Sequence, residues 1–172
     1  VWTDWEYGRA TAGQDWWPIW YSPSVMAAVN RIHAEGLAEI RWLSTWGDHA
    51  NGSLRELLGL PEFLVAGREP QWARAEGHTW ESVSHGDYAG AGAVDPLTGR
   101  WWKFDVVRAL HTTDPERPII WTDDDLRRHR RVTAWMRLHT KSLLISPRPA
   151  QGLTPRMIKQ INTYLGVAKA PV

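Results

Sequence analysis

Apolar residues recur at helical spacing in several stretches of this chain. From Ser22-Pro23 to Gly36 they return every three or four positions, and the serine and proline supply an N-cap and a first-turn residue. Similar patterns predict helices in four more segments: "HANGSLRELLG" (49–59), "WWKFDVVRALH" (101–111), 126–139, and the stretch from Thr154-Pro155 to Gly166.

Short apolar runs alternate with these helices. The runs are "AEIRWLST" (38–45), "RPIIWT" (117–122) and "SLLISP" (142–147), each of a length typical of a buried strand. Strands that alternate with helices form right-handed βαβ units around a largely parallel sheet that is covered on both faces. We therefore expect an α/β fold, a three-layer sandwich with a mainly parallel central sheet, in a single domain over residues 1–172.

Two segments depart from this alternation. Residues 61–100 are rich in Gly, Pro and Asp and have no sustained period, which predicts a loop-rich insertion. Residues 1–21 hold five of the 13 tryptophans and are expected to form an apolar lid over the active site, a stacking platform for a base or sugar, or a surface for another subunit. We favour the lid. The five are Trp2, Trp5, Trp16, Trp17 and Trp20.

Composition narrows the classes of function. The chain has no cysteine, which excludes disulfides, thiolate catalysis and cysteine-type zinc sites. It has neither an apolar run long enough to span a membrane nor the pattern of a signal peptide, so we expect a cytoplasmic protein that does not bind membranes. The glycine-rich motifs of P-loop and dinucleotide-binding proteins are also absent.

Polar side chains follow the predicted strands at their carboxyl ends. Ser44 and Thr45 end one strand, Asp123, Asp124 and Asp125 end another, and Lys103 opens the helix between them. Ligands of parallel α/β sheets bind at this edge, and carboxylates, a hydroxyl and a lysine together suit Mg²⁺ and a phosphoryl group. The alternatives are that the aspartates complement a helix dipole and that the hydroxyls only cap a helix.

The basic run "RRHRR" (127–131) follows the aspartates directly. Clustered arginines suit a nucleic-acid partner, but the formal net charge of +1 favours a solvated helix face, to which His129 would belong. None of the seven histidines has the spacing of a zinc motif. Nucleic acid is therefore a possible partner that we do not favour.

The order of "IRWLSTWGDHAN", "WWK", "IIWTDDDL" and "LLISPRPAQGLTPRMIKQINTYL" resembles the haloacid dehalogenase-like hydrolase superfamily, in particular a small Trp-rich group. The resemblance covers residues 20–166 and implies a Rossmann-like fold with little or no separate cap domain. It also implies that Ser44, or Thr45, and Lys103 hold a transferring phosphoryl group, and that Asp123 and Asp124 hold Mg²⁺. The implied function is Mg²⁺-dependent hydrolysis of a small phosphate monoester.

The first motif of that superfamily, an Asp-x-Asp pair after the central strand, has no match in this chain. Asp4 and Glu6 have the right separation, but too few residues precede them to form a strand. We expect a strand upstream of Val1 to carry the motif, and without it the sheet should have a gap at its centre. If the nucleophile is absent altogether, the alternative is a non-catalytic protein that binds nucleic acid or a protein.

Overall fold

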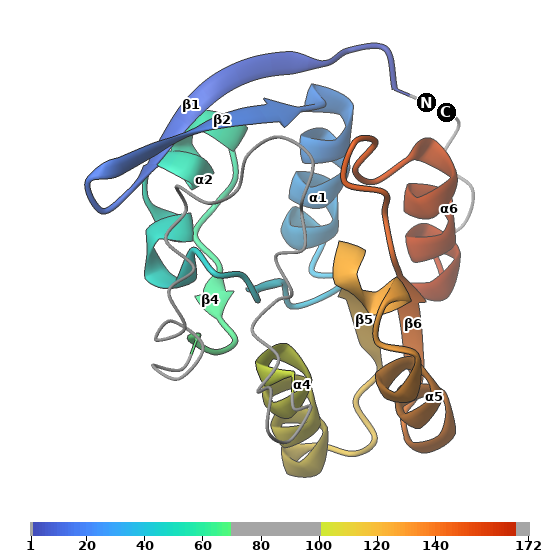
Figure 1. Ribbon diagram of the computed structural model, residues 1–172. Coiled ribbons are helices and arrows are strands. Elements are labelled where there is room, and N and C mark those ends of the chain that lie inside the picture. Colours follow the sequence, from blue (N-terminus) through green and yellow to red (C-terminus); the bar gives the residue numbers. More distant parts are fainter. Residues whose placement is uncertain (1, 70–100, 168–172) are drawn as a thin grey trace.

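The computed structural model describes residues 2–69 and 101–167, which form a mixed α/β fold (Figure 1). Helices α1 (Pro23–Ala34) and α6 (Pro155–Tyr164) begin at the predicted caps, because the Ser22 and Thr154 side chains accept hydrogen bonds from backbone N–H groups two or three residues into each helix. Both predictions are confirmed. None of the helices in the described residues is long and apolar enough to cross a membrane.

The remaining predicted helices are also present, and two of them, 49–59 and 126–139, are divided. They are η1 (Gly47–Asn51), α2 (Ser53–Leu58), α4 (Trp102–Thr113), η3 (Asp124–Arg127) and α5 (Arg130–His139). The single helix expected over 126–139 is wrong. The Asp123 carboxylate accepts the Asp125 N–H and the Arg128 N–H returns to the Asp125 carbonyl, so the chain closes a 3₁₀ turn before α5 begins.

Two βαβ units supply the parallel strands. β3 (Arg41–Trp42) and β4 (Leu64–Val65) pair in parallel and are joined through η1 and α2. β5 (Ile119–Thr122) and β6 (Ser142–Ile145) pair in the same way through η3 and α5. β4 lies within the predicted insertion 61–100, where no periodic pattern marks it, and residues 70–100 of that prediction lie outside the described residues.

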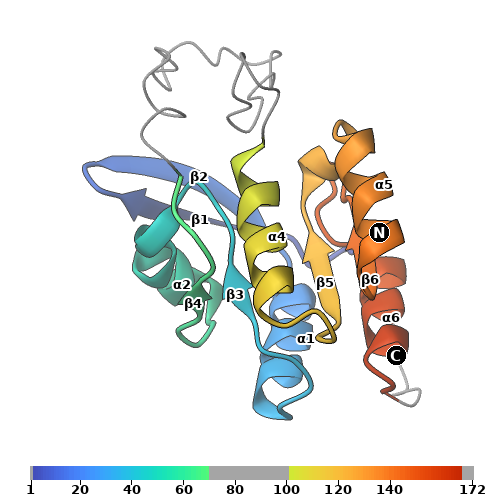
Figure 2. The same ribbon diagram turned by 90° about the horizontal axis from the view of Figure 1, so that it is seen from below.

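The two parallel pairs do not join into one sheet, so a continuous central parallel sheet is not present in the described part of the chain. Figure 2 shows β4, β3, β5 and β6 side by side in this order, with the break between β3 and β5. β3 is only two residues long, far shorter than the strand expected over 38–45, because one of its edges has no partner strand in residues 2–69 and 101–167.

Backbone groups on both sides of this break point away from the existing partners. The N–H groups of Ile119 and Asp123 donate to β6 and its extensions, so the groups of Ile120 and Thr122 face the break. Likewise the Trp42 carbonyl accepts from Ala66 beyond β4, so its neighbour Leu43 presents backbone groups to the break. The sequence analysis expects such a gap where a central strand is lacking, and that explanation of the break stays a prediction.

Helices lie on both sides of the strands (Figure 1). On one side Ile120 and Ile145 pack with residues of α1 and α6, including Val25 and Ile158. On the other side Trp121 packs with residues of α4, η3 and α5; the buried members of that cluster are Trp101, Val107, Leu126 and Met136. The alternation along β5 and β6 therefore places the carboxyl ends of these strands between two helix layers.

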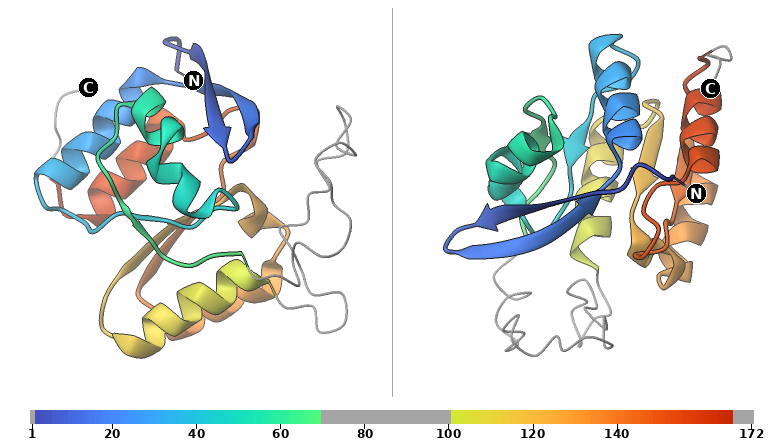
Figure 3. Two further views of the ribbon diagram at one scale, coloured as in Figure 1. Left: turned by 90° about the vertical axis from the view of Figure 1, so that its left-hand side faces the viewer. Right: turned by 90° about the horizontal axis from the view of Figure 1, so that it is seen from above.

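The Trp-rich segment is a β-hairpin of β1 (Glu6–Ala12) and β2 (Asp15–Tyr21) (Figure 3). Its inner face packs on η1 and α2, where Ala10 is fully buried beside Leu54. Gly8 lies so close to Leu57 that a Cβ atom there would collide with the leucine. The hairpin is thus fixed to the β3–β4 unit, and its use as a lid stays a prediction.

Candidate functional site

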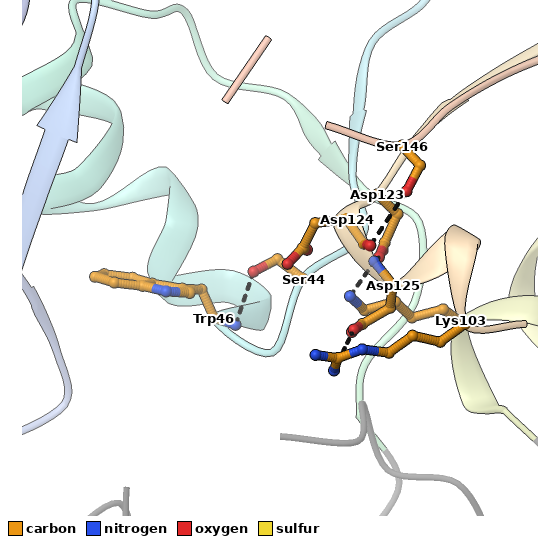
Figure 4. A network of polar contacts seen from close by, with 8 residues as sticks. Ser44, Trp46, Lys103, Asp123, Asp124, Asp125 and Ser146 are labelled. Carbon is orange, nitrogen blue, oxygen red and sulfur yellow. Dashed lines mark hydrogen bonds and ion pairs between the residues drawn. The ribbon is translucent and has the colours of Figure 1, made fainter. Parts of the chain in front are cut away.

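The chain turns sharply where β5 ends, and this acidic turn, residues 123–125, is the centre of the site (Figure 4). The Asp123 N–H donates to the Ile145 carbonyl at 3.0 Å and continues the strand pairing. One Asp123 carboxylate oxygen accepts the Asp125 N–H at 2.9 Å. Asp123 and Asp125 are buried, 7% and 9% exposed, whereas Asp124 is more accessible.

Lys103 reaches the acidic turn from the first turn of α4, as the sequence predicts. Its ammonium lies 2.8 Å from Asp123 Oδ2, and the two side chains are 11% and 4% exposed. Arg128 bonds to Asp125 Oδ1 at 3.2 Å. Two residues that the sequence places twenty positions apart thus form a buried ion pair at the carboxyl end of β5.

The carboxylates of the acidic turn are held close against their mutual repulsion. Burial raises the pKa of Asp125, and the neighbouring charges of Asp124 and Asp123 raise it further. Lys103 and Arg128 compensate two of the three negative charges, which leaves one uncompensated. The three residues offer oxygens that lie within 4.8 Å of one another, and carboxylate oxygens are the ligands that Mg²⁺ prefers.

Ser146 is a part of this site that the sequence analysis did not identify. Its hydroxyl donates to the Asp124 carbonyl at 3.2 Å and accepts the Arg127 N–H at 3.3 Å, so it fastens the acidic turn to the end of β6. The signal was present, because Ser146 ends the third apolar run just as Ser44 ends the first. Polar residues at the carboxyl ends of parallel strands line such sites, and Ser146 satisfies this criterion as Ser44 does.

Ser44 and Thr45 lie at the end of β3, across the break from the acidic turn. The Ser44 Oγ accepts the Trp46 N–H at 3.2 Å, and therefore supports the turn that leads into η1. Figure 4 shows Ser44 between Trp46 and Asp124. Within residues 2–69 and 101–167 the Thr45 side chain has no hydrogen-bond partner, so Ser44 is the better placed of the two predicted hydroxyls.

His129 also differs from its sequence prediction. It is half-buried and its ring stacks on Trp101, with centroids 3.9 Å apart and an angle of 12° between the planes, instead of lying on a solvated helix face. Trp101 in turn stacks on Trp121 at 5.0 Å. Burial lowers the pKa of His129, and Lys103 and Arg128 lower it further against the opposing effect of Asp123.

The arginines on either side of His129 match the prediction. Arg127, Arg128, Arg130 and Arg131 are all exposed, as expected for the solvated face of a helix. Arg128 is the member of the run that turns back to the acidic turn.

Asp4 and Glu6 are engaged away from the acidic turn. The Asp4 carboxylate accepts hydrogen bonds from the Ser22 hydroxyl at 2.7 Å and the Ser24 N–H at 2.8 Å, at the start of α1. Hydrogen bonds from Ser24 and Ser22 lower the pKa of Asp4 to about 2. Glu6 accepts from the Tyr21 hydroxyl across the hairpin. Asp4 therefore attaches the N-terminal segment to the start of α1, and Glu6 links the two strands of the hairpin.

No known protein family, curated protein or solved structure matches this chain. The chemical interpretation of the site therefore depends on the arrangement of its side chains alone. A hard cation can be held by the oxygens of the acidic turn, and an anion can be held by the Lys103 ammonium beside it.

Proposed function

We propose that this chain belongs to a Mg²⁺-dependent phosphohydrolase of the haloacid dehalogenase type, acting on a small phosphate monoester. The observation that carries the proposal is the buried Lys103–Asp123 ion pair inside a turn of three carboxylates, at the carboxyl end of a parallel strand. A metal cation needs negatively charged ligands and a phosphate group needs positively charged ones, and the acidic turn with Lys103 places both kinds side by side.

Each residue has a distinct proposed role. Asp123 and Asp124 hold Mg²⁺, with Asp125 as the third candidate ligand, and bound Mg²⁺ would neutralise charge on the phosphoryl oxygens. Lys103 and Ser44 orient the phosphoryl oxygens by donating hydrogen bonds to them. Asp124 is the most accessible carboxylate of the turn and is therefore the one best placed to meet a cation from solvent.

The nucleophile is proposed to come from a further parallel strand that fills the break between β3 and β5. The backbone groups of Leu43, Ile120 and Thr122 that face the break would pair with it, and the two βαβ units would then form the three-layer sandwich expected from the sequence. A strand in this position ends between Ser44 and the acidic turn, where an aspartate at its carboxyl end would meet the phosphate.

The reaction then proceeds in two displacements. A carboxylate oxygen of this aspartate attacks phosphorus, the ester P–O bond breaks, and the leaving alkoxide takes a proton from solvent, which the hydrolysis step later returns. Water next attacks phosphorus in the aspartyl-phosphate, which releases inorganic phosphate and restores the carboxylate. Lys103 offsets the charge that gathers on the phosphoryl oxygens in both steps.

The test compares Asp124→Asn with Asp15→Asn in the protein that carries the proposed strand. We expect Asp124→Asn to abolish Mg²⁺-dependent hydrolysis of p-nitrophenyl phosphate while circular dichroism shows an intact fold. Asp15→Asn makes the same chemical change at an exposed position of the hairpin and should leave the rate unchanged. Full activity of Asp124→Asn would remove the metal assignment.

A second candidate is a binding protein without turnover. The outer face of the hairpin favours it, because Tyr7, Trp16 and Trp20 are 48%, 55% and 67% exposed there and Arg9 lies over the Trp16 ring. Exposed aromatic rings can stack on bases or pack against a protein. Binding of single-stranded nucleic acid that weakens with salt, together with no phosphatase activity in any form of the protein, would support this candidate.

A further inference from the structure

Three rings form a continuous stack beside the acidic turn, and they come from the three segments that build the site. Trp121 lies on β5, two residues before Asp123. Trp101 lies at the start of α4, two residues before Lys103. His129 is the N-cap residue of α5, two positions after η3 ends. Trp101 lies between the other two, 5.0 Å from Trp121 and 3.9 Å from His129. We call this arrangement the ring stack.

The ring stack determines where Lys103 lies. The Lys103 ammonium is 2.8 Å from Asp123 Oδ2 and 5.9 Å from the centre of the Trp101 ring, at the outer limit of a cation–π interaction. Trp101 caps α4 without a side-chain hydrogen bond, and its buried indole N–H has no partner in the described part of the chain. Packing between rings is therefore what fixes Trp101, and through it the first turn of α4.

His129 closes the outer end of the ring stack. Trp101 is 2% exposed, and the imidazole that covers it is half-buried. A neutral imidazole suits this place because a second positive charge there would repel both Lys103 and Arg128, in keeping with the lowered pKa of the ring. The two rings are nearly parallel, with 12° between their planes, so the imidazole covers the face of the Trp101 ring.

We infer that His129 is a positioning residue of this site: it holds Trp101 in the ring stack and thereby keeps the Lys103 ammonium on Asp123, ready to receive a phosphate oxygen. The part about phosphate rests on the proposed function. The part about Lys103 does not, because the position of the ammonium can be measured without any substrate.

The experiment measures how fast an amine-selective reagent modifies Lys103 in the folded chain, using mass spectrometry with exposed Lys141 as the internal standard. His129→Gln removes the ring and should make Lys103 react about threefold to tenfold faster relative to Lys141, the range for losing one aromatic contact. His129→Phe keeps a ring and should restore the protection. A proton-transferring role would not be rescued by phenylalanine.

His139→Gln is the matched control. His139 also lies against a tryptophan, Trp135 at 4.9 Å, but at the opposite end of α5. His139 is exposed, so its replacement should change stability little and should leave Lys103 protected. Equal exposure of Lys103 in both glutamine variants, or no rescue by phenylalanine, would overturn the inference.

The same variants separate this inference from the proposed function. In the protein that carries the proposed strand, His129→Gln should slow p-nitrophenyl phosphate hydrolysis by about the factor that its Lys103 labelling changes, and His129→Phe should restore the rate. If the labelling behaves as expected but no form of the protein hydrolyses phosphate esters, the positioning role stands and the phosphohydrolase fails. If hydrolysis occurs and the Lys103 labelling of His129→Gln is unchanged, the phosphohydrolase stands and the positioning role fails.

Discussion

Replacing Lys103 by methionine removes the ammonium from the acidic turn and keeps most of the side-chain volume. The Asp123 carboxylate, 4% exposed, then loses its charged partner at 2.8 Å and keeps only the Asp125 N–H. Breaking a buried ion pair by removing one partner costs about 3 to 5 kcal/mol. We expect a value near the lower limit, about 3 kcal/mol, because the retained N–H bond still solvates the carboxylate.

The same substitution should strengthen cation binding. In the wild-type chain Lys103 competes with a divalent cation for Asp123, and without it the acidic turn has two uncompensated negative charges instead of one. We therefore expect Lys103→Met to bind Mg²⁺ about tenfold more tightly, a difference of about 1.4 kcal/mol. The wild-type chain also gains stability from Mg²⁺, so saturating Mg²⁺ should reduce the loss by about the same 1.4 kcal/mol, roughly half of it.

Urea denaturation with and without Mg²⁺, together with calorimetric titration of Mg²⁺, measures both effects. Lys141→Met is the control, because Lys141 pairs with Glu116 on the surface, where the side chains are 64% and 83% exposed. Its loss of stability should be small, because solvent screens an exposed ion pair, and independent of Mg²⁺. If Lys103→Met loses the same stability with and without Mg²⁺, and its Mg²⁺ affinity equals that of the wild type, the competition between Lys103 and the cation is refuted.

Three more predictions concern the framework of the site. Met136→Ala, at a fully buried position, should cost about 2 to 5 kcal/mol in urea denaturation, whereas Leu138→Ala on the exposed side of the same helix should change stability by less than about 0.5 kcal/mol. Ser146→Ala should lower the free energy of unfolding by about 1 kcal/mol and weaken Mg²⁺ binding, because it removes the hydrogen bond to the Asp124 carbonyl. Unchanged Mg²⁺ affinity would show that the acidic turn keeps its conformation without Ser146. Asp4 has a pKa of about 2 against an ordinary 3.8, so its contribution to folding stability is complete above pH 4 and disappears as the pH falls toward 2. Asp4→Asn should therefore be less stable than the wild type at pH 7, and the difference in melting temperature should shrink between pH 4 and pH 2. A difference that does not change with pH would show that the Ser22 and Ser24 hydrogen bonds are unimportant.

Local signals made the helix starts predictable from the sequence. Ser22 and Thr154 cap α1 and α6 through contacts within one turn, and such contacts depend on a few neighbouring residues. The positions of Lys103 and the acidic turn were also predictable, because the carboxyl end of a parallel strand and the start of the preceding helix meet at one edge. Neither inference required knowledge of distant contacts.

The hairpin was not predictable from periodicity because tryptophans lie on both of its faces. Trp17 pairs with buried Ala10 on the inner side, while Trp16 is exposed on the outer side, so an alternating pattern does not stand out. The usable signal was Gly13, which has a positive φ of 66° in the two-residue turn between Ala12 and Asp15.

The ring stack was hidden for a different reason. The histidine in "RRHRR" is surrounded by exposed arginines, and nothing in the local pattern separates it from them. Only the approach of Trp101, at the start of α4, defines its environment. The sequence predicts that the carboxylates follow β5, but it does not predict that His129 packs on Trp101, since that contact joins residues 28 positions apart.

The break between β3 and β5 also affects how this chain behaves in concentrated solution. Open strand edges are templates for addition of strands from other molecules, and natural proteins protect them with charge, proline or a covering element. Ile120 and Thr122 on one side and Leu43 on the other carry none of these protective side chains. No strand among residues 2–69 and 101–167 pairs with these edges. The chain should therefore self-associate as its concentration rises, and a short apolar peptide that occupies the break should return it to the monomer.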